Sequence, residues 1–194
     1  MKSVCVYCGS ADGIHPDYYR GAAEMGACLA NNGIKLIYGA GKTGLMGALA
    51  DGALSAGGEV IGVVPENLNS ATLIHAHLTH LEIVQDIQQR KARMNALADA
   101  LIALPGGYGT FDELFEALTW TQIGLQRKPI GLLNIRGYFD PLLAMVGRAM
   151  EEKFIYPEHR KILAIEDTPA GLIQALENYS YPENMDRWVN REEF

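Results

Sequence analysis

The chain has 194 residues, of which 48% are hydrophobic and 20% are charged, which is enough for one domain with a full core and typical of a globular protein. Its net charge of −7 argues against broad binding to nucleic acid or to a membrane surface, and no apolar run approaches the length of a membrane span. Three cysteines are too few for a disulfide framework, and a strand-like pattern begins at Ser3 with no signal peptide before it, so we expect a cytoplasmic protein.

Strand-like and helix-like patterns alternate along the whole chain. In chain order we expect a strand at Ser3–Cys8, a helix at Asp17–Asn32, a strand at Ile34–Tyr38, a helix at Leu45–Ala56 and strands at Glu59–Val64 and His80–Val84. A helix at Ile87–Ala98, a strand at Ala100–Leu104, a helix at Phe111–Gly124, a strand at Pro129–Asn134, a helix at Phe139–Lys153, a strand at Ile162–Glu166 and a helix at Pro169–Asn178 follow.

Several of the expected strands are continuous apolar runs, as in Ala100–Leu104, which indicates burial on both faces of a parallel sheet. The sequence therefore predicts an α/β fold: one doubly wound, mostly parallel sheet with helices on both faces, Rossmann-like, over residues 1–178. Residues 179–194 are predicted to form a polar C-terminal extension that is either docked or frayed, with Trp188 as its one large anchor. Ligands of such folds bind at the carboxyl ends of the strands.

The segment Pro105–Glu113, PGGYGTFDE, joins a buried strand to the start of a helix. Its glycines allow close approach of backbone N–H groups to a ligand, and a helix N-terminus suits a phosphate. Glu113 has two interpretations. Thr110-x-x-Glu113 has the spacing of a capping box, whereas the loop context places the acid at the mouth of a phosphate site. We expect Asp112 and Glu116 to be helix-start or solvent-facing charges.

A second glycine-rich loop follows the strand that ends at Tyr38. Gly39-x-Gly41-x-x-Gly44 fits the dinucleotide fingerprint, with Glu66 near the place of the ribose ligand. The signal is weak, because such turns also arise for packing reasons and a Rossmann fold places the fingerprint after its first strand. Ser10, after the first strand, either reaches a ligand or caps a turn.

Neither the cysteines nor the histidines suggest a metal site. Cys5 and Cys8 form a C-x-x-C within a strand pattern, and no second pair of ligands accompanies them, so we expect unreactive thiols. His75, His77 and His80 lie close together in a polar stretch without a carboxylate or cysteine to complete a shell, and we expect them at the surface.

The expected helix at Ile87–Ala98 carries one charged residue on its apolar face. The face repeats at helical spacing through Ile87, Arg90, Met94 and Leu97. Arg90 either extends its stem over the edge of the core or directs its guanidinium into the binding crevice to meet a phosphate or a developing charge.

Taken together, these segments resemble the LOG family, the cytokinin riboside 5′-monophosphate phosphoribohydrolases. Pro105–Glu113 is similar to the family's PGGxGTxxE signature, and Arg90–Met94 to its R-K-x-x-M element, and the resemblance extends over nearly the whole chain. The chain departs from the family at Gln88-Gln89, where His-Glu is usual, and at Gly39-Ala40-Gly41, where three glycines are usual.

The resemblance implies hydrolysis of the N-glycosidic bond of a nucleoside 5′-monophosphate to a free base and ribose 5-phosphate, without a cofactor or metal. Arg90 and Glu113 fall on the two catalytic positions. The residues expected to contact the substrate are Ser10, Gly41, Thr43, Gly44, Met94, Gly106, Gly107, Gly109 and Thr110. The resemblance also implies a homodimer or a larger homo-oligomer.

Two other functions remain open at this point. The fingerprint at Gly39–Gly44 would serve an NAD(P)-dependent oxidoreductase, and the same fold would serve a non-catalytic carrier of a nucleotide or cofactor. A "lysine decarboxylase" label, often carried by family members, has no support here, because no lysine stands in an identifiable site for pyridoxal phosphate.

Overall fold

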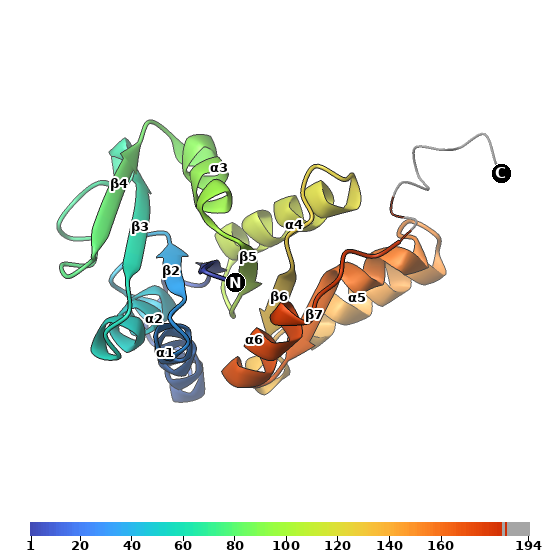
Figure 1. The fold of residues 1–194 in the computed structure, drawn as a ribbon, viewed down its shortest axis with the longest axis horizontal. Helices are drawn as coiled ribbons and strands as arrows, with labels where there is room; N and C mark the ends of the chain where they lie inside the picture. The colour runs from blue at the N-terminus through green and yellow to red at the C-terminus, as the bar shows by residue number, and fades with distance from the viewer. Residues whose placement is uncertain (184, 186–194) are drawn as a thin grey trace.

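The structure, a computed structural model, describes residues 1–183 and 185. Its centre is one seven-stranded sheet in the order β4-β3-β2-β1-β5-β6-β7, in which every neighbouring pair is parallel (Figure 1). The strands are β1 (Ser3–Tyr7), β2 (Lys35–Tyr38), β3 (Val60–Pro65), β4 (His80–Val84), β5 (Ala100–Ala103), β6 (Ile130–Leu133) and β7 (Leu163–Glu166). The predicted α/β fold is confirmed, and its sheet is entirely parallel.

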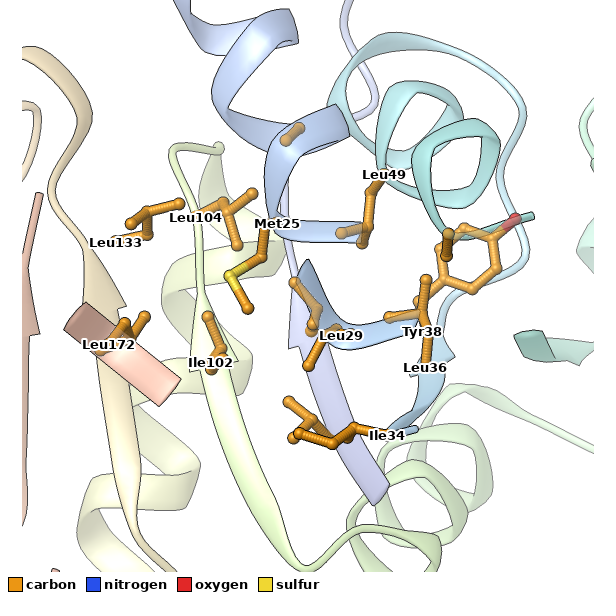
Figure 2. Packing of buried hydrophobic residues seen from close by; sticks show 14 of the residues in the cluster. Met25, Leu29, Ile34, Leu36, Tyr38, Leu49, Ile102, Leu104, Leu133 and Leu172 are labelled. Atoms are coloured by element: carbon orange, nitrogen blue, oxygen red, sulfur yellow. The ribbon is translucent and has the colours of Figure 1, made fainter. Parts of the chain in front are cut away.

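Helices cover both faces of this sheet. They are α1 (Pro16–Asn31), α2 (Gly44–Ser55), α3 (Ile87–Leu97), α4 (Tyr108–Gln122), α5 (Asp140–Glu151) and α6 (Pro169–Glu177). The core side chains of α1, α2 and α6 pack on one face (Figure 2), and those of α3 and α4 pack on the other. Among the described helices, none is long and apolar enough to span a membrane.

Strand β1 shows why the sequence contains continuous apolar runs. Val4 and Val6 point into the core beneath α1 and α2, while Cys5 and Tyr7 point into the core beneath α3 and α4. All five residues of this strand are buried. A central strand of a doubly wound sheet therefore needs apolar side chains at every position, not at alternate ones.

The site is positioned by the point at which the strand order reverses. The chain runs outward from β1 to β4 on one side of the sheet and then returns to place β5 beside β1. The N–H of Leu104 donates to the carbonyl of Tyr7 at 2.9 Å, and the N–H of Gly9 donates to the carbonyl of Pro105 at 3.0 Å. The loops that follow β1 and β5 therefore lie side by side at the carboxyl edge of the sheet, where folds of this class bind ligands.

The described part of the predicted extension packs back on the chain. The hydroxyl of Tyr181 donates to the carbonyl of Thr121 at 3.1 Å, and the guanidinium of Arg127 lies 5.0 Å from the centre of the Tyr181 ring. Met185 is buried. The predicted anchor Trp188 lies outside the described residues, and the boundary at residue 178 stays a prediction.

Candidate active site

A pocket of about 550 Å³ opens at the reversal point between β1 and β5. Its walls come from the loops after these two strands, from α3 and α4, and from the turn after β6. The predicted functional residues that line it are Ser10, Arg90, Met94, Gly106, Gly107, Gly109, Thr110 and Glu113. The structure thus brings both expected catalytic side chains and the PGGYGT loop into one cavity.

The start of α4 decides between the two interpretations of Glu113. The helix begins at Tyr108, with Gly107 as its N-cap, and its first hydrogen bond runs from the N–H of Phe111 to the carbonyl of Gly107. Thr110 is therefore buried inside the first turn and is not a cap. The capping-box interpretation is wrong, and Glu113 lies in the second turn, on the wall of the pocket.

The N-terminus of α4 keeps its backbone donors free. No described residue accepts a hydrogen bond from the N–H of Tyr108, Gly109 or Thr110, and no side chain caps the helix. At the N-terminus of α2, by contrast, the N–H groups of Leu45 and Met46 both donate to the carbonyl of Gly9, at 3.0 and 3.3 Å. Of these two helix N-termini, only that of α4 therefore offers free N–H groups to an anion.

The glycines of this loop serve different purposes. A Cβ at Gly106 would lie 2.1 Å from Oγ1 of Thr110 and 2.8 Å from the amide nitrogen of Gly9, so close packing of the two loops requires glycine there. A Cβ at Gly107 or Gly109 would meet no atom within 4 Å. These two glycines therefore border open space at the start of α4, which leaves room for a bound group.

The Gly39–Gly44 loop supports the pocket but contributes little of its lining. Gly41, Thr43 and Gly44 are not among the described pocket residues, contrary to the expectation that they contact the ligand. Oγ1 of Thr43 donates to the carbonyl of Ser10 at 2.8 Å, and the N–H of Gly44 donates to Oδ1 of Asp12 at 2.9 Å. Because a dinucleotide fingerprint needs this helix N-terminus for the pyrophosphate, the occupied donors disfavour that interpretation.

Arg90 enters the pocket between two stretches of backbone. Its Nε donates to the carbonyl of Val63, at the end of β3, at 3.1 Å. Its Nη2 lies so close to Gly39 that a Cβ there would be only 1.6 Å away. The side chain therefore lines the cavity and does not simply extend over the edge of the core. This arrangement also explains why position 39 needs glycine.

Glu113 is partly buried and lines the same pocket as this guanidinium. Burial raises the pKa of its carboxyl to about 7, and the positive charge of Arg90 opposes that rise. Among the described residues, no ion pair joins Arg90 to Glu113, and no group donates a hydrogen bond to the carboxylate. The pocket thus holds a carboxyl with a pKa near neutrality together with a positively charged guanidinium.

Several residues of the pocket were not anticipated from the sequence. Tyr18 and Tyr138 line it beside the apolar side chains of Ile14, Leu45 and Met46. The hydroxyl of Tyr138 donates to the carbonyl of Gly106, and its ring stacks on Phe111 with the ring centres 6.5 Å apart. Tyr138 follows β6, and binding sites of this fold form at the carboxyl ends of strands. That rule was the one feature of the sequence that could have indicated Tyr138 as a pocket residue.

The charges around α4 are partly as expected. Asp112 and Glu116 were predicted to be helix-start or solvent-facing charges. The side chain of Asp112 is 62% exposed and that of Glu116 is 27% exposed, and both accept hydrogen bonds from Nζ of Lys91, at 2.9 and 2.8 Å. The side chain of Lys91 is only 8% exposed. A buried lysine that is paired with two carboxylates links α3 to α4.

One of the three neighbouring histidines was also misplaced. His75 is buried, and its Nε2 lies 3.1 Å from Oδ1 of Asp51, whereas His77 and His80 are exposed as predicted. Cys5, Cys8 and Cys28 are free thiols, and burial raises the pKa of each. Within the described residues, no group of histidine, cysteine and carboxylate side chains is arranged to hold a metal ion.

The fold and the site define a Rossmann-like α/β protein with a pocket, beside a free helix N-terminus, at the reversal of strand order. A family model described as "Possible lysine decarboxylase" matches residues 46–176. A probable cytokinin riboside 5′-monophosphate phosphoribohydrolase of Oryza sativa subsp. japonica is 44% identical over 180 residues, which are 93% of this chain and 74% of that protein. The cytokinin riboside 5′-monophosphate phosphoribohydrolase LOG7 of Arabidopsis thaliana is 42% identical over 92% of this chain and 82% of its own. The chain belongs to this family, the LOG family.

Solved structures add the fold alone. The molybdenum cofactor binding protein of Rippkaea orientalis superposes with a TM-score of 0.70 at 21% identity, covering 91% of this chain and 96% of its own. The decarboxylase description of the family model does not fit the pocket. Among the described lining residues there is no lysine to form the Schiff base on which pyridoxal phosphate depends.

Proposed function

We propose that this protein is a phosphoribohydrolase that hydrolyses the N-glycosidic bond of nucleoside 5′-monophosphates, either AMP or cytokinin riboside 5′-monophosphates. The observation that carries the proposal is that Arg90 of α3 and Glu113 of α4 line one pocket, beside the free N-terminus of α4. Family membership supports it, since curated relatives are phosphoribohydrolases by name.

The 5′-phosphate is proposed to bind at the start of α4. The free N–H groups there and the positive end of the helix dipole suit a dianion, and Gly107 and Gly109 leave the space open. Ser10 and Met94 line the remainder of the pocket and are proposed to contact the sugar or the base. Gly41, Thr43 and Gly44 are proposed to act indirectly, by holding the segment around Ser10 in place.

In the reaction, a water molecule attacks C1′ and the bond from C1′ to the base nitrogen breaks. The electron pair of that bond leaves with the base, and the sugar passes through an oxocarbenium-like state as in other glycosidic cleavages. Glu113, as carboxylate, stabilises the positive C1′ and accepts the proton of the water, which then passes to the departing base. Arg90 stabilises negative charge on the leaving base or on the phosphate.

The pKa of Glu113 suits this role. A pKa of about 7 leaves a substantial fraction of carboxylate at neutral pH and still allows the group to return a proton. An anionic phosphate near Glu113 would raise the pKa further, so the guanidinium of Arg90 is needed to keep the carboxylate available.

The test is release of free base, measured by HPLC with AMP and N6-isopentenyl-AMP in parallel. Glu113→Ala and Arg90→Ala are each expected to reduce turnover at least about a hundredfold, the usual scale for loss of one electrostatic or acid–base group. Near-normal turnover in folded Glu113→Ala protein would contradict the assignment. Tight binding of nucleotide with no product would favour the carrier alternative, and binding of NAD(P) with hydride transfer would favour the oxidoreductase.

We further propose a homodimer or larger homo-oligomer, assembled through α5 and the adjoining face of α4. None of the residues of α5 is buried, and Met145 is 58% exposed. An apolar groove of about 260 Å³ lies between the two helices and β7, and its lining includes Phe115, Leu118, Leu143, Val146 and Met150. Apolar surface of this kind is typical of interfaces.

The unpaired thiols Cys5, Cys8 and Cys28 favour a reducing, cytoplasmic location.

A further inference from the structure

The two proposed catalytic residues lie on separate helices, and each helix packs mainly on the sheet. Helix α3 packs on β1 to β4, and α4 packs on β1 and β5 (Figure 1). Arg90 is in the first turn of α3, and Glu113 is in the second turn of α4. The distance between guanidinium and carboxylate therefore depends on whatever fixes one helix relative to the other.

Lys91, the residue after Arg90, makes a direct link between the helices. Its Nζ lies 2.9 Å from Oδ2 of Asp112 and 2.8 Å from Oε2 of Glu116. These two carboxylates are one helical turn apart and flank Glu113 in the sequence. With its side chain only 8% exposed, the ammonium would be costly to bury without such partners.

The link continues along the same face of α3. Asn95, one turn after Lys91, is also buried, and its Nδ2 donates to Oε1 of Gln126 at 2.9 Å. Nε2 of Gln126 in turn donates to the carbonyl of Ala117 at 2.9 Å. Nζ of Lys128 donates to the carbonyl of Asn95 at 2.6 Å. A polar seam, defined by Lys91, Asn95, Gln126 and their partners, therefore ties α3 to α4 along the length of the contact.

We propose that Lys91 is a positioning residue, which through this seam fixes the placement of Arg90 relative to Glu113. The inference rests on the proposed function of that pair. A hydrophobic residue of similar volume would fill the same space, so burial alone does not require a lysine here. What a hydrophobic residue does not provide is a directional tie to both carboxylates, and misplacement of a catalytic group by about 1 Å is enough to cost about a hundredfold in rate.

Lys91 also affects the charge of the site. Its ammonium lowers the pKa of Glu113, whereas Asp112 and Glu116 raise it. In Lys91→Met the two carboxylates lose their counter-charge, so the pKa of Glu113 is expected to rise. Positioning and charge therefore have to be separated experimentally.

Helix α3 offers a matched control on its other side. Arg93 makes two hydrogen bonds to Glu82 of β4, from Nε to Oε2 at 2.6 Å and from Nη2 to Oε1 at 3.0 Å. Arg93→Met removes an ion pair that anchors the same helix without touching α4. We expect wild-type turnover from Arg93→Met and at least about a tenfold fall in kcat, with a smaller change in KM, from Lys91→Met.

The variant K91M/D112N removes the tie and keeps the local net charge at −1, because it takes away the ammonium and one of its two carboxylate partners. A carbon-13 titration of the Glu113 carboxyl should show a raised pKa in Lys91→Met and a value near that of the wild type in the double variant. The kcat of the double variant should nevertheless stay low. Wild-type kcat in the double variant would reduce Lys91 to a charge effect and overturn the proposal.

Two further outcomes would also overturn it: unchanged kcat in folded Lys91→Met, or an equal loss in Arg93→Met. If Lys91→Met does not fold, Glu116→Gln is tested instead. We expect its kcat to fall by less than that of Lys91→Met. An unchanged kcat in Glu116→Gln would count against the proposal. A wild-type protein that releases no base from either nucleotide would reject the proposed function. A crystal structure of Lys91→Met would then decide the inference: a shift of the Arg90 side chain relative to Glu113 would support it, and an unchanged placement would overturn it.

Discussion

At the scale of single residues, the environment of Glu113 in the pocket disfavours its charged form. Glu113 is partly buried in the pocket, accepts no hydrogen bond from a described residue, and has only the nearby charges of Arg90 and Lys91 to compensate for lost hydration. Such an arrangement is typical of functional carboxyl groups, since a purely structural one would be paired or exposed. It should cost folding stability in a pH-dependent way.

The predicted effect can be measured with Glu113→Gln. The native pKa of about 7 lies above the ordinary value of 4.5, so between these pH values the folded protein binds more protons than the unfolded chain. Stability therefore falls as pH rises through this window. The variant lacks the ionisation and should be more stable than the wild type at pH 8, by up to about 3 kcal/mol, with no difference below about pH 4.5.

Urea denaturation at several pH values measures the free energy of unfolding of the wild type and of Glu113→Gln. Glu24→Gln, on an exposed part of α1, is the matched control and should not change the pH dependence. A stability difference for Glu113→Gln that is independent of pH would show that the carboxyl has an ordinary pKa in the folded protein.

The sequence could predict Glu113 and Arg90 but not Lys91, for a physical reason. A glycine-rich turn before a helix and a charge on an apolar stripe are local patterns. Burial of Lys91 depends on partners that are 21 and 25 residues away in the sequence. Whether these partners come close to Lys91 depends on how helices α3 and α4 pack on the sheet. The tyrosine after β6 was missed for the same reason, because its contact with Gly106 spans 32 residues.

At the scale of elements, most strands and helices could be predicted because their apolar residues repeat with the spacing of one type of secondary structure. The element whose start was predicted wrongly, with a consequence for the site, was helix α4. The apolar pattern begins at Phe111, and the preceding Gly-Tyr-Gly has low helix propensity, so the expected helix began there. The structure begins it at Tyr108, because the loop is fixed from outside by Gly9 and Tyr138. Tertiary contacts outweighed local preference at the place where the donors are needed.

Tyr138→Phe tests whether this loop is held by the hydroxyl of Tyr138. Loss of the hydrogen bond to the carbonyl of Gly106 should loosen the loop that is proposed to bind the phosphate, and KM for AMP should rise about five- to tenfold, the equivalent of about 1 kcal/mol. Because the ring remains, the stacking on Phe111 is kept and kcat should change less. Steady-state kinetics by HPLC give both values.

Tyr179→Phe is the control for the loss of a tyrosine hydroxyl. Among the described residues, the buried hydroxyl of Tyr179 has no hydrogen-bond partner, and it lies outside the pocket. Its removal should leave KM unchanged. An unchanged KM in Tyr138→Phe as well would mean that the backbone contact between Gly9 and Pro105 holds the loop without help.

At the scale of the whole molecule, one side of the sheet is incompletely covered. Helix α5 lines a groove with α4 and β7 without burying any of its residues, and Phe154 just beyond it is 84% exposed. Helix α4 contributes Glu113 to the pocket and Phe115 to the neighbouring groove. A second copy of the chain bound at this groove would therefore lie beside the candidate active site, because α4 lines both the groove and the pocket.

Met145→Lys is expected to separate the copies. A charge placed in the centre of an apolar interface carries a desolvation cost of several kcal/mol, so the variant should run as a monomer near 21.2 kDa where the wild type runs at twice that mass or more. Light scattering after size-exclusion chromatography measures this. Leu73→Lys, a similarly exposed apolar side chain on the loop before β4, is the control and should leave the mass unchanged. A monomeric wild type, or a Met145→Lys variant that keeps the wild-type mass, would place any interface elsewhere and leave the exposed face of α5 without a role in self-association.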